Sequence, residues 1–136
     1  MPRIEDILDA ACAVVKLRRQ HVELSVNVVS PAVMRRLNRT YRSKDKTTDV
    51  LSFPLLKKHE VSTARKKRDI LVLGDIFIGR SFAKKETMFA FLIVHGFLHL
   101  LGYDHEQSER EARVMFALQD TILSQLGYAP PNDLRH

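Results

Sequence analysis

The sequence His95-Gly-Phe-Leu-His99-Leu-Leu-Gly102-Tyr-Asp-His105 contains three of the six histidines of the chain. It overlaps the stretch 88–101, which is apolar on nearly every side and therefore predicts a buried helix. On such a helix His95 and His99, four residues apart, lie on one face about one turn from each other. Gly102 tolerates the left-handed conformation that ends a helix, so the chain can turn back and bring His105 to the same point.

Three imidazoles at one point predict a bound metal ion, because burying the rings is costly unless each ring nitrogen finds a partner. A lone histidine on an apolar helix is usually a core residue with a hydrogen bond, but three at this spacing indicate a site. Three protein ligands leave a fourth position for water, which is typical of catalytic rather than structural zinc. Imidazole ligands suit zinc, nickel or copper. We expect one Zn²⁺ per chain, with nickel or another divalent transition metal as the alternative.

The histidine spacing is also that of the extended zinc-peptidase motif, which suggests proteolysis as an alternative. That motif requires a glutamate directly after the first histidine, as the general base that activates the zinc-bound water. Gly96 occupies this position and has no side chain to accept a proton. A zinc peptidase is therefore disfavoured.

Hydrophobic periodicity on both sides of this segment predicts an alternation of helices and strands. A capping box at Ser108 and Glu111 begins the last helix, and Ser30 followed by Pro31 begins the second. Residues 57–69 are rich in lysine and arginine, lack a hydrophobic period, and are predicted to be the only long loop. The predicted helices cover 4–15, 31–41, 88–101 and 108–126, and the predicted strands cover 22–28, 49–54 and 70–78.

Composition narrows the class of protein. The 136 residues carry 22 Lys and Arg against 16 Asp and Glu, a formal net charge of +6, which favours a polyanionic partner. A single cysteine, Cys12, excludes an internal disulfide and a cysteine-based zinc site. No apolar run is long enough to span a membrane, and the acidic start of the chain is unlike a signal peptide. We therefore expect one soluble, cytoplasmic domain over residues 1–136, with no membrane partner.

The histidine segment resembles the signature of the YbeY endoribonucleases, also called ribosomal RNA maturation factors. Two further blocks are similar to that family, LNRTYRSKDKTTDVLSFP at 37–54 and LGDI at 73–76. The resemblance extends from about residue 22 to Gly127. It implies an α+β, zincin-like fold, in which a mixed four-stranded sheet packs against helices and the metal lies at the end of a buried helix. The 20 residues from Asp75 to His95 are fewer than the family usually has there, so we expect the intervening helix to be trimmed.

The resemblance also implies an activity. The family cleaves single-stranded RNA and acts in maturation of the 3′ end of small-subunit ribosomal RNA and in ribosome quality control, so ribosomal RNA and the small ribosomal subunit are the expected partners. The family's zinc ligands correspond to His95, His99 and His105, and its functional arginine corresponds to Arg42. We expect Arg42 and His95 to be the catalytic residues. The alternative is a noncatalytic ribosome-assembly factor, in which zinc stabilises the fold and the basic surface binds ribosomal RNA.

Several further side chains are candidates for substrate contact. A phosphodiester beside a metal calls for a planar, permanently charged donor, which Arg42 provides. Asp104 either orients an imidazole or caps its loop, and Asp75, inside an apolar strand, requires a hydrogen-bonding partner. Basic side chains in the predicted loop are either solvated or bind phosphates away from the scissile bond. The predicted substrate-binding residues are Arg42, Ser52, Arg65, Lys66, Lys67 and Arg68.

Overall fold

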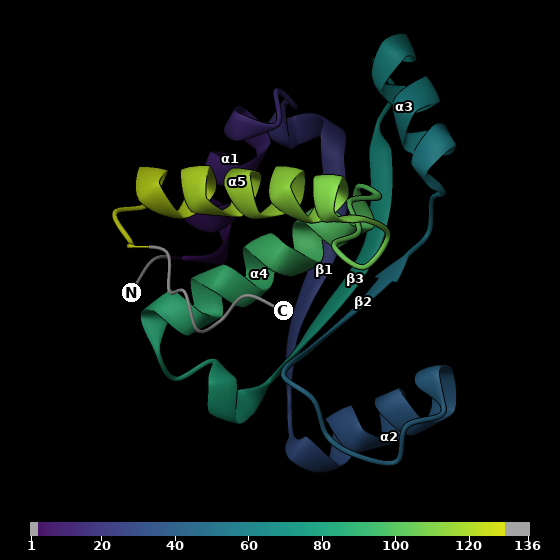
Figure 1. The fold of residues 1–136 in the computed structure, drawn as a ribbon, viewed down its shortest axis with the longest axis vertical. Coiled ribbons are helices and arrows are strands. Elements are labelled where there is room, and N and C mark those ends of the chain that lie inside the picture. The colour runs from purple at the N-terminus through teal and green to yellow at the C-terminus, as the bar shows by residue number, and fades with distance from the viewer. Residues whose placement is uncertain (1–2, 130–136) are drawn as a thin grey trace.

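The computed structural model describes residues 3–129, so both ends of the predicted domain 1–136 lie outside the described residues. Within that range the chain forms five α-helices, two short 3-10 helices and three strands (Figure 1). In chain order they are α1 (Ile4–Val14), η1 (Arg19–His21), β1 (Val22–Val29), α2 (Pro31–Arg42), β2 (Val50–Pro54), α3 (Lys58–Lys67), β3 (Leu71–Gly79), η2 (Arg80–Phe82), α4 (Glu86–Leu100) and α5 (Glu109–Gln125).

The sheet is mixed, with strand order β1-β3-β2. β1 runs parallel to the central strand β3, and β2 runs antiparallel to it. The edge position of β2 suits Pro54, which has no N–H to donate to a further strand. The three strands predicted from the sequence are therefore confirmed. The fourth strand implied by the family resemblance is not found within residues 3–129.

A bulge in β3 explains the glycine in the middle of this apolar strand. Glu23 lies opposite Val72, whereas Leu24 lies opposite Gly74, so one residue of β3 is left unpaired. Gly74 has φ +132°, and a Cβ there would lie 2.1 Å from the carbonyl oxygen of Phe53. Only glycine fits this position.

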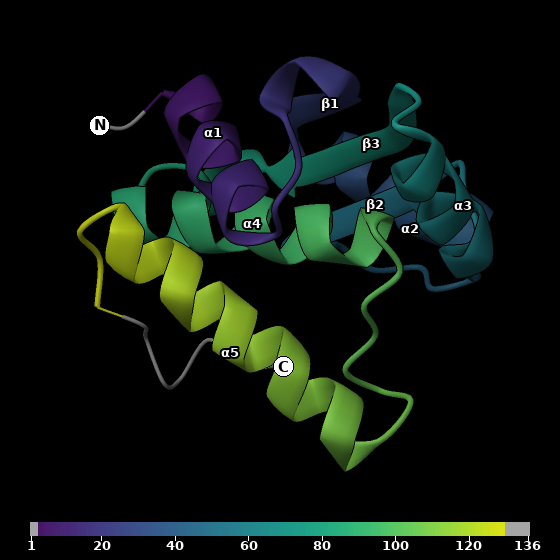
Figure 2. The ribbon, with the colours of Figure 1, turned by 90° about the horizontal axis from the view of Figure 1, so that it is seen from above.

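The core forms around α4, which is apolar on all sides because it is covered on all sides. Figure 2 shows α4 between the sheet and α5, with α1 beside it. α4 contacts β2, β3, α1 and α5, and buries the large side chains Phe91, Ile93 and Phe97. Apolar burial of this extent is the main stabilising contribution to a domain of this size. The prediction of a buried helix ending beside the histidines is confirmed.

The basic segment is a helix, so the prediction of a long loop over 57–69 is wrong. α3 begins after Lys57, whose backbone N–H donates to the side chain of Glu60 at 2.9 Å, and ends at Arg68 in the left-handed conformation. Val61 is the single fully buried residue of this helix. One apolar anchor is too few to produce a hydrophobic period, although lysine and arginine are good helix formers.

The connection between β3 and α4 is short. Between these elements the chain forms only η2 and a turn, so no α-helix lies there, as the short spacing predicted. Figure 1 shows α2 and α3 at opposite ends of the sheet, with the end of α4 reaching toward the strands between them. Among residues 3–129, no helix is both long enough and apolar enough to cross a membrane.

Candidate metal centre and cleft

The geometry of a helix end brings the three histidines together. His95 and His99 lie on successive turns of α4, which ends one residue after His99. Gly102 follows with φ +101°, and its N–H donates to the carbonyl oxygen of His99 at 2.9 Å. The N–H of Tyr103 donates to the carbonyl oxygen of Leu98 at 3.1 Å. This glycine-terminated helix end reverses the chain and returns His105 to the pair on the helix.

The three imidazoles converge closely enough to share one ion. One ring nitrogen from each of His95, His99 and His105 lies within 4.8 Å of the other two. The Nε2 atoms of His95 and His99 are 3.1 Å apart. Within the described residues, the buried Nδ1 of His105 has no hydrogen-bond partner. A donor set of three imidazoles fits a zinc, nickel or copper ion.

Burial favours the neutral form of the His99 ring. His95 is 4% exposed, and His99 and His105 are half-buried. Burial, followed by the neighbouring charge of His105, lowers the pKa of His99 below its ordinary value of 6.5. A neutral imidazole has a free lone pair, which is the form that binds a metal.

Gln119 contacts the centre and is not among the residues predicted from sequence. It lies on α5 and is 1% exposed, and its Oε1 is 2.6 Å from Nδ1 of His95. Its sequence signal is a polar residue on the face of α5 that otherwise buries Met115, Ile122 and Leu123. A buried amide requires partners, but the sequence does not say which partner the amide has.

The histidines line a cleft of about 490 Å³ that Arg42 and Ser52 also line. Arg42 is the last residue of α2, and Ser52 lies on the edge strand β2. The charge of Arg42 is a minor contributor to the lowered pKa of His99, after burial and His105. Side chains from α2, β2, α4 and the turn after α4 therefore meet at one cleft. The acidic residues Asp49, Asp104 and Glu106 line it as well.

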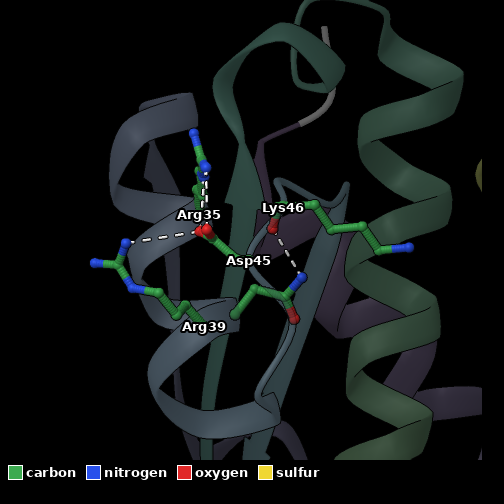
Figure 3. Close-up of polar contacts among 5 residues, drawn as sticks. Arg35, Arg39, Asp45 and Lys46 are labelled. Atoms are coloured by element: carbon green, nitrogen blue, oxygen red, sulfur yellow. Dashed lines mark hydrogen bonds and ion pairs between the residues drawn. The ribbon is translucent and has the colours of Figure 1, made fainter.

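The segment 43–49 connects Arg42 to β2 and is held against α2 by exposed ion pairs and by one hydrogen bond from a buried side chain (Figure 3). Asp45 forms ion pairs with Arg35 at 2.8 Å and with Arg39 at 3.6 Å. The hydrogen bond from Arg35 lowers the pKa of the Asp45 carboxyl. Asn38 donates its side-chain N–H to the carbonyl oxygen of Lys46 at 2.9 Å. These contacts set the path of the chain along one side of the cleft.

The basic residues 65–68 lie outside this cleft. Arg65 donates to the carbonyl oxygen of Val15 at 2.7 Å, so it joins α3 to the end of α1. Arg65 and Lys66 line a separate groove of about 340 Å³, which Gly102 also lines. Arg68 and Arg65 line a further hollow of about 310 Å³. Lys67 is exposed on α3.

Two acidic residues have local partners. Asp104 accepts a hydrogen bond from the backbone N–H of Glu106 at 2.9 Å, which lowers the pKa of its carboxyl. Of the two roles open to it, the structure gives Asp104 the capping of its own loop. Asp75 accepts a hydrogen bond from the hydroxyl of Ser25 across the sheet, which supplies the partner that its place in an apolar strand requires.

Comparisons with known proteins agree on one family. The family model described as endoribonuclease YbeY matches residues 2–127. An endoribonuclease YbeY from Persephonella marina is 41% identical over 119 residues, which cover 81% of this chain and 74% of that protein. One from Geobacillus thermodenitrificans is 43% identical over 134 residues, covering 91% and 85% respectively.

A solved structure supports the same fold. The solution structure of TM1509 from Thermotoga maritima matches with a TM-score of 0.54 at 23% identity, and covers 95% of this chain and 90% of that one. At this identity the match indicates the fold alone. The family assignment rests on the family model and on the relatives above 40% identity. The chain belongs to the endoribonuclease YbeY family.

Proposed function

We propose that the chain is a zinc-dependent endoribonuclease that cleaves single-stranded RNA and acts in the cytoplasm as one domain over residues 1–136. One observation carries the proposal: three imidazoles converge in an open cleft that an exposed arginine also lines. An open cleft leaves a coordination position and space for a substrate, unlike a closed structural zinc site. The family's endoribonucleases, at 41% and 43% identity, support the same activity.

The proposed substrate is the 3′ region of small-subunit ribosomal RNA, and the proposed setting is ribosome maturation and quality control on the small subunit. The net charge of +6 supports a polyanionic substrate. Among residues 3–129, the cleft lining includes no Phe, Tyr or Trp on which bases could stack. We therefore expect cleavage sites to be chosen by strandedness and position on the subunit more than by base identity.

Five of the cleft residues have definite tasks in this proposal. His95, His99 and His105 would hold the zinc ion, which when bound would polarise the scissile phosphate or activate water. Arg42 donates two parallel N–H groups to phosphate oxygens and stabilises the charge that develops on them. Ser52, on β2, donates its hydroxyl to the RNA backbone. A zincin-like arrangement, with a histidine pair on a buried helix beside an edge strand, is part of the same proposal.

The basic residues of α3 form a second contact with RNA. Lys66, Lys67 and Arg68 are exposed. The two grooves that Arg65 lines contain further basic side chains, namely Lys58 in one and Lys16 and Arg18 in the other. Since the first of these grooves includes Gly102, it adjoins the turn that ends the metal helix. An RNA strand leaving the cleft along α3 would keep its phosphates beside positive charge. These contacts add affinity that depends on salt but add no sequence preference.

Packing at Gly96 argues against a zinc peptidase. A Cβ at this position would lie 2.9 Å from Cγ2 of Ile76 and 3.0 Å from Oγ of Ser52. A glutamate at the position where peptidases carry their general base would therefore require the buried Ile76 to shift. Chelator-sensitive hydrolysis of casein by the pure protein would contradict this argument.

The proposal is tested by cleavage of single-stranded and duplex RNA of one sequence, with protein stripped by chelator and then reloaded with zinc. We expect cleavage of the single strand, its loss with chelator, and its return with zinc. Protein carrying His95→Ala, purified in parallel, controls for a contaminating nuclease. If the zinc-loaded protein binds ribosomal RNA and leaves it intact, the noncatalytic assembly factor is the correct function. The basic surface of α3 is the observation that favours this alternative.

A further inference from the structure

We propose that Gln119 is a positioning residue that holds His95 in the tautomer able to bind the metal. The inference rests on the proposed metal site and concerns how that site is prepared before an ion arrives. His95 is anchored on both of its ring nitrogens. Its Nδ1 is 2.6 Å from Oε1 of Gln119, and its Nε2 is 3.1 Å from Nε2 of His99.

Hydrogen-bond chemistry determines which nitrogen carries the proton. A neutral imidazole has one N–H, and a carbonyl oxygen can only accept. With Oε1 of Gln119 facing it, Nδ1 of His95 must therefore be the donor. Its Nε2 then presents a lone pair toward His99 and His105. The opposite tautomer would place two acceptors 2.6 Å apart and a proton at the point where the three rings converge.

Core packing does not explain why a glutamine occupies this position. Its neighbours on the buried face of α5 are Met115, Ile122 and Leu123. Its own Nε2 is buried and has no hydrogen-bond partner within residues 3–129. An unpaired buried amide costs free energy that an apolar side chain of the same size would not. Turning the amide around would direct an N–H toward Nδ1 of His95 and force the ring into the tautomer that excludes a metal.

The imidazole of His95 also stacks against an aromatic ring. Phe91 stacks on His95 with ring centroids 5.8 Å apart and an interplanar angle of 22°. Phe91 and His95 share α4, whereas Gln119 comes from α5. Stacking on Phe91 limits the tilt of the His95 imidazole. The hydrogen bond to Gln119 limits rotation of the ring in its own plane and selects the tautomer of His95. The packing of α5 on α4 therefore prepares a ligand of the metal.

The test compares Gln119→Met with Gln119→Glu, and uses Gln125→Met on the exposed face of α5 as the matched control. Zinc affinity is measured by competition with a chromophoric chelator, and thermal unfolding is measured without and with zinc. Methionine removes the acceptor and the unpaired amide together. We expect Gln119→Met to bind zinc about 10- to 100-fold more weakly. Its metal-free form should unfold near the wild-type temperature, because removal of the unpaired amide offsets the hydrogen bond lost by Nδ1 of His95.

Glutamate keeps an acceptor toward Nδ1 of His95, so Gln119→Glu should retain wild-type zinc affinity. Its metal-free form should be less stable, since it buries a carboxylate, and zinc should raise its unfolding temperature about as much as it raises that of wild type. Gln125→Met should match wild type in every measurement. A merely structural role for Gln119 predicts the reverse pattern, in which Gln119→Met loses stability and folded protein keeps its zinc affinity.

Nuclear magnetic resonance of the metal-free wild-type protein tests the tautomer without any variant. Long-range proton–nitrogen correlations should show His95 protonated at Nδ1 and unprotonated at Nε2. A proton on Nε2, or wild-type zinc affinity in folded Gln119→Met, would overturn the proposal. Neither measurement uses RNA. Failure of RNA cleavage with the expected zinc and tautomer results would therefore refute the nuclease function and leave the role of Gln119 standing.

Discussion

The two sides of the cleft are positioned by different kinds of interaction. On one side, His95 is 4% exposed on a helix that packs against the sheet, α1 and α5. On the other side, Arg42 is an exposed residue at the end of α2, followed by a segment held by ion pairs on the protein surface. Core packing determines the metal side, whereas the side that would meet the phosphate is held by exposed ion pairs and one hydrogen bond from the buried Asn38.

This difference teaches which functions of the site can be separated. Close-packed interiors respond to the loss or gain of one methyl group, whereas exposed ion pairs contribute little and are screened by salt. Changes on the α4 side should therefore alter metal binding and stability together. Changes on the α2 side should alter activity and leave metal binding and stability unchanged.

The largest effect is expected for His99→Ala, which removes one of three ligands. Bound zinc, measured by elemental analysis of purified protein, should fall well below one per chain, and RNA cleavage should be lost with it. Stability should fall as well, because metal binding is linked to folding. His59→Ala, at an exposed histidine of α3, is the matched control and should keep its zinc. Stoichiometric zinc in His99→Ala would rule out the three-histidine site.

Arg42→Ala separates the two sides of the cleft. Zinc content and thermal unfolding should stay near wild type, while single-strand cleavage falls by about 10²-fold, a typical cost of removing a donor aimed at transition-state charge. Arg42→Lys should recover part of the rate, since a point charge cannot reproduce the planar fork.

The control for Arg42 is Lys67→Ala on α3. It should weaken RNA binding modestly and reduce the dependence of binding on salt. Cleavage by Arg42→Ala at the wild-type rate would show that Arg42 does not contact the reacting phosphate.

Gly96→Ala tests the close packing on the α4 side. The added methyl would lie 2.9 Å from Cγ2 of Ile76 and 3.1 Å from its Cδ1. Ile76 is fully buried and stiff about χ1, so it cannot easily move away. Overpacking costs about 1–3 kcal/mol, and the better helix propensity of alanine offsets about 1 kcal/mol. We expect a net loss of about 1 kcal/mol in urea unfolding. The loss should shrink in an Ile76→Val background, and a gain in stability would show that the helix can shift without cost.

The smallest effect is expected for Asp45→Ala on the α2 side. Since the pKa of Asp45 is lowered in the folded protein, its ion pairs are complete above its ordinary value of 3.8 and are lost as pH falls through the folded value. At neutral pH the variant should unfold at nearly the wild-type temperature and retain zinc. Amide hydrogen exchange in 43–49 should become faster, and added salt should produce a similar change in wild type. Loss of zinc from Asp45→Ala would mean that the two sides are coupled.

Local features of this protein follow from its sequence. The convergence of His95 and His99 depends only on helical spacing, and the return of His105 depends on one glycine that permits a left-handed turn. The first strand follows from alternation, the second and third from short apolar runs, and burial of α4 from its apolar composition. Each of these inferences uses residues within a few turns of one another, where bond geometry limits the possible outcomes.

Tertiary structure decided what depends on neighbours distant in the sequence. α3 forms although Val61 is its single buried residue, and the strand order β1-β3-β2 results from pairing across intervening helices. The contact between Gln119 and His95 joins residues 24 positions apart. A buried polar residue indicates that a hydrogen-bonding partner is needed, but the packing of two helices determines which residue that partner is. That packing is a property of the whole core, because each interface depends on the shapes of all the others.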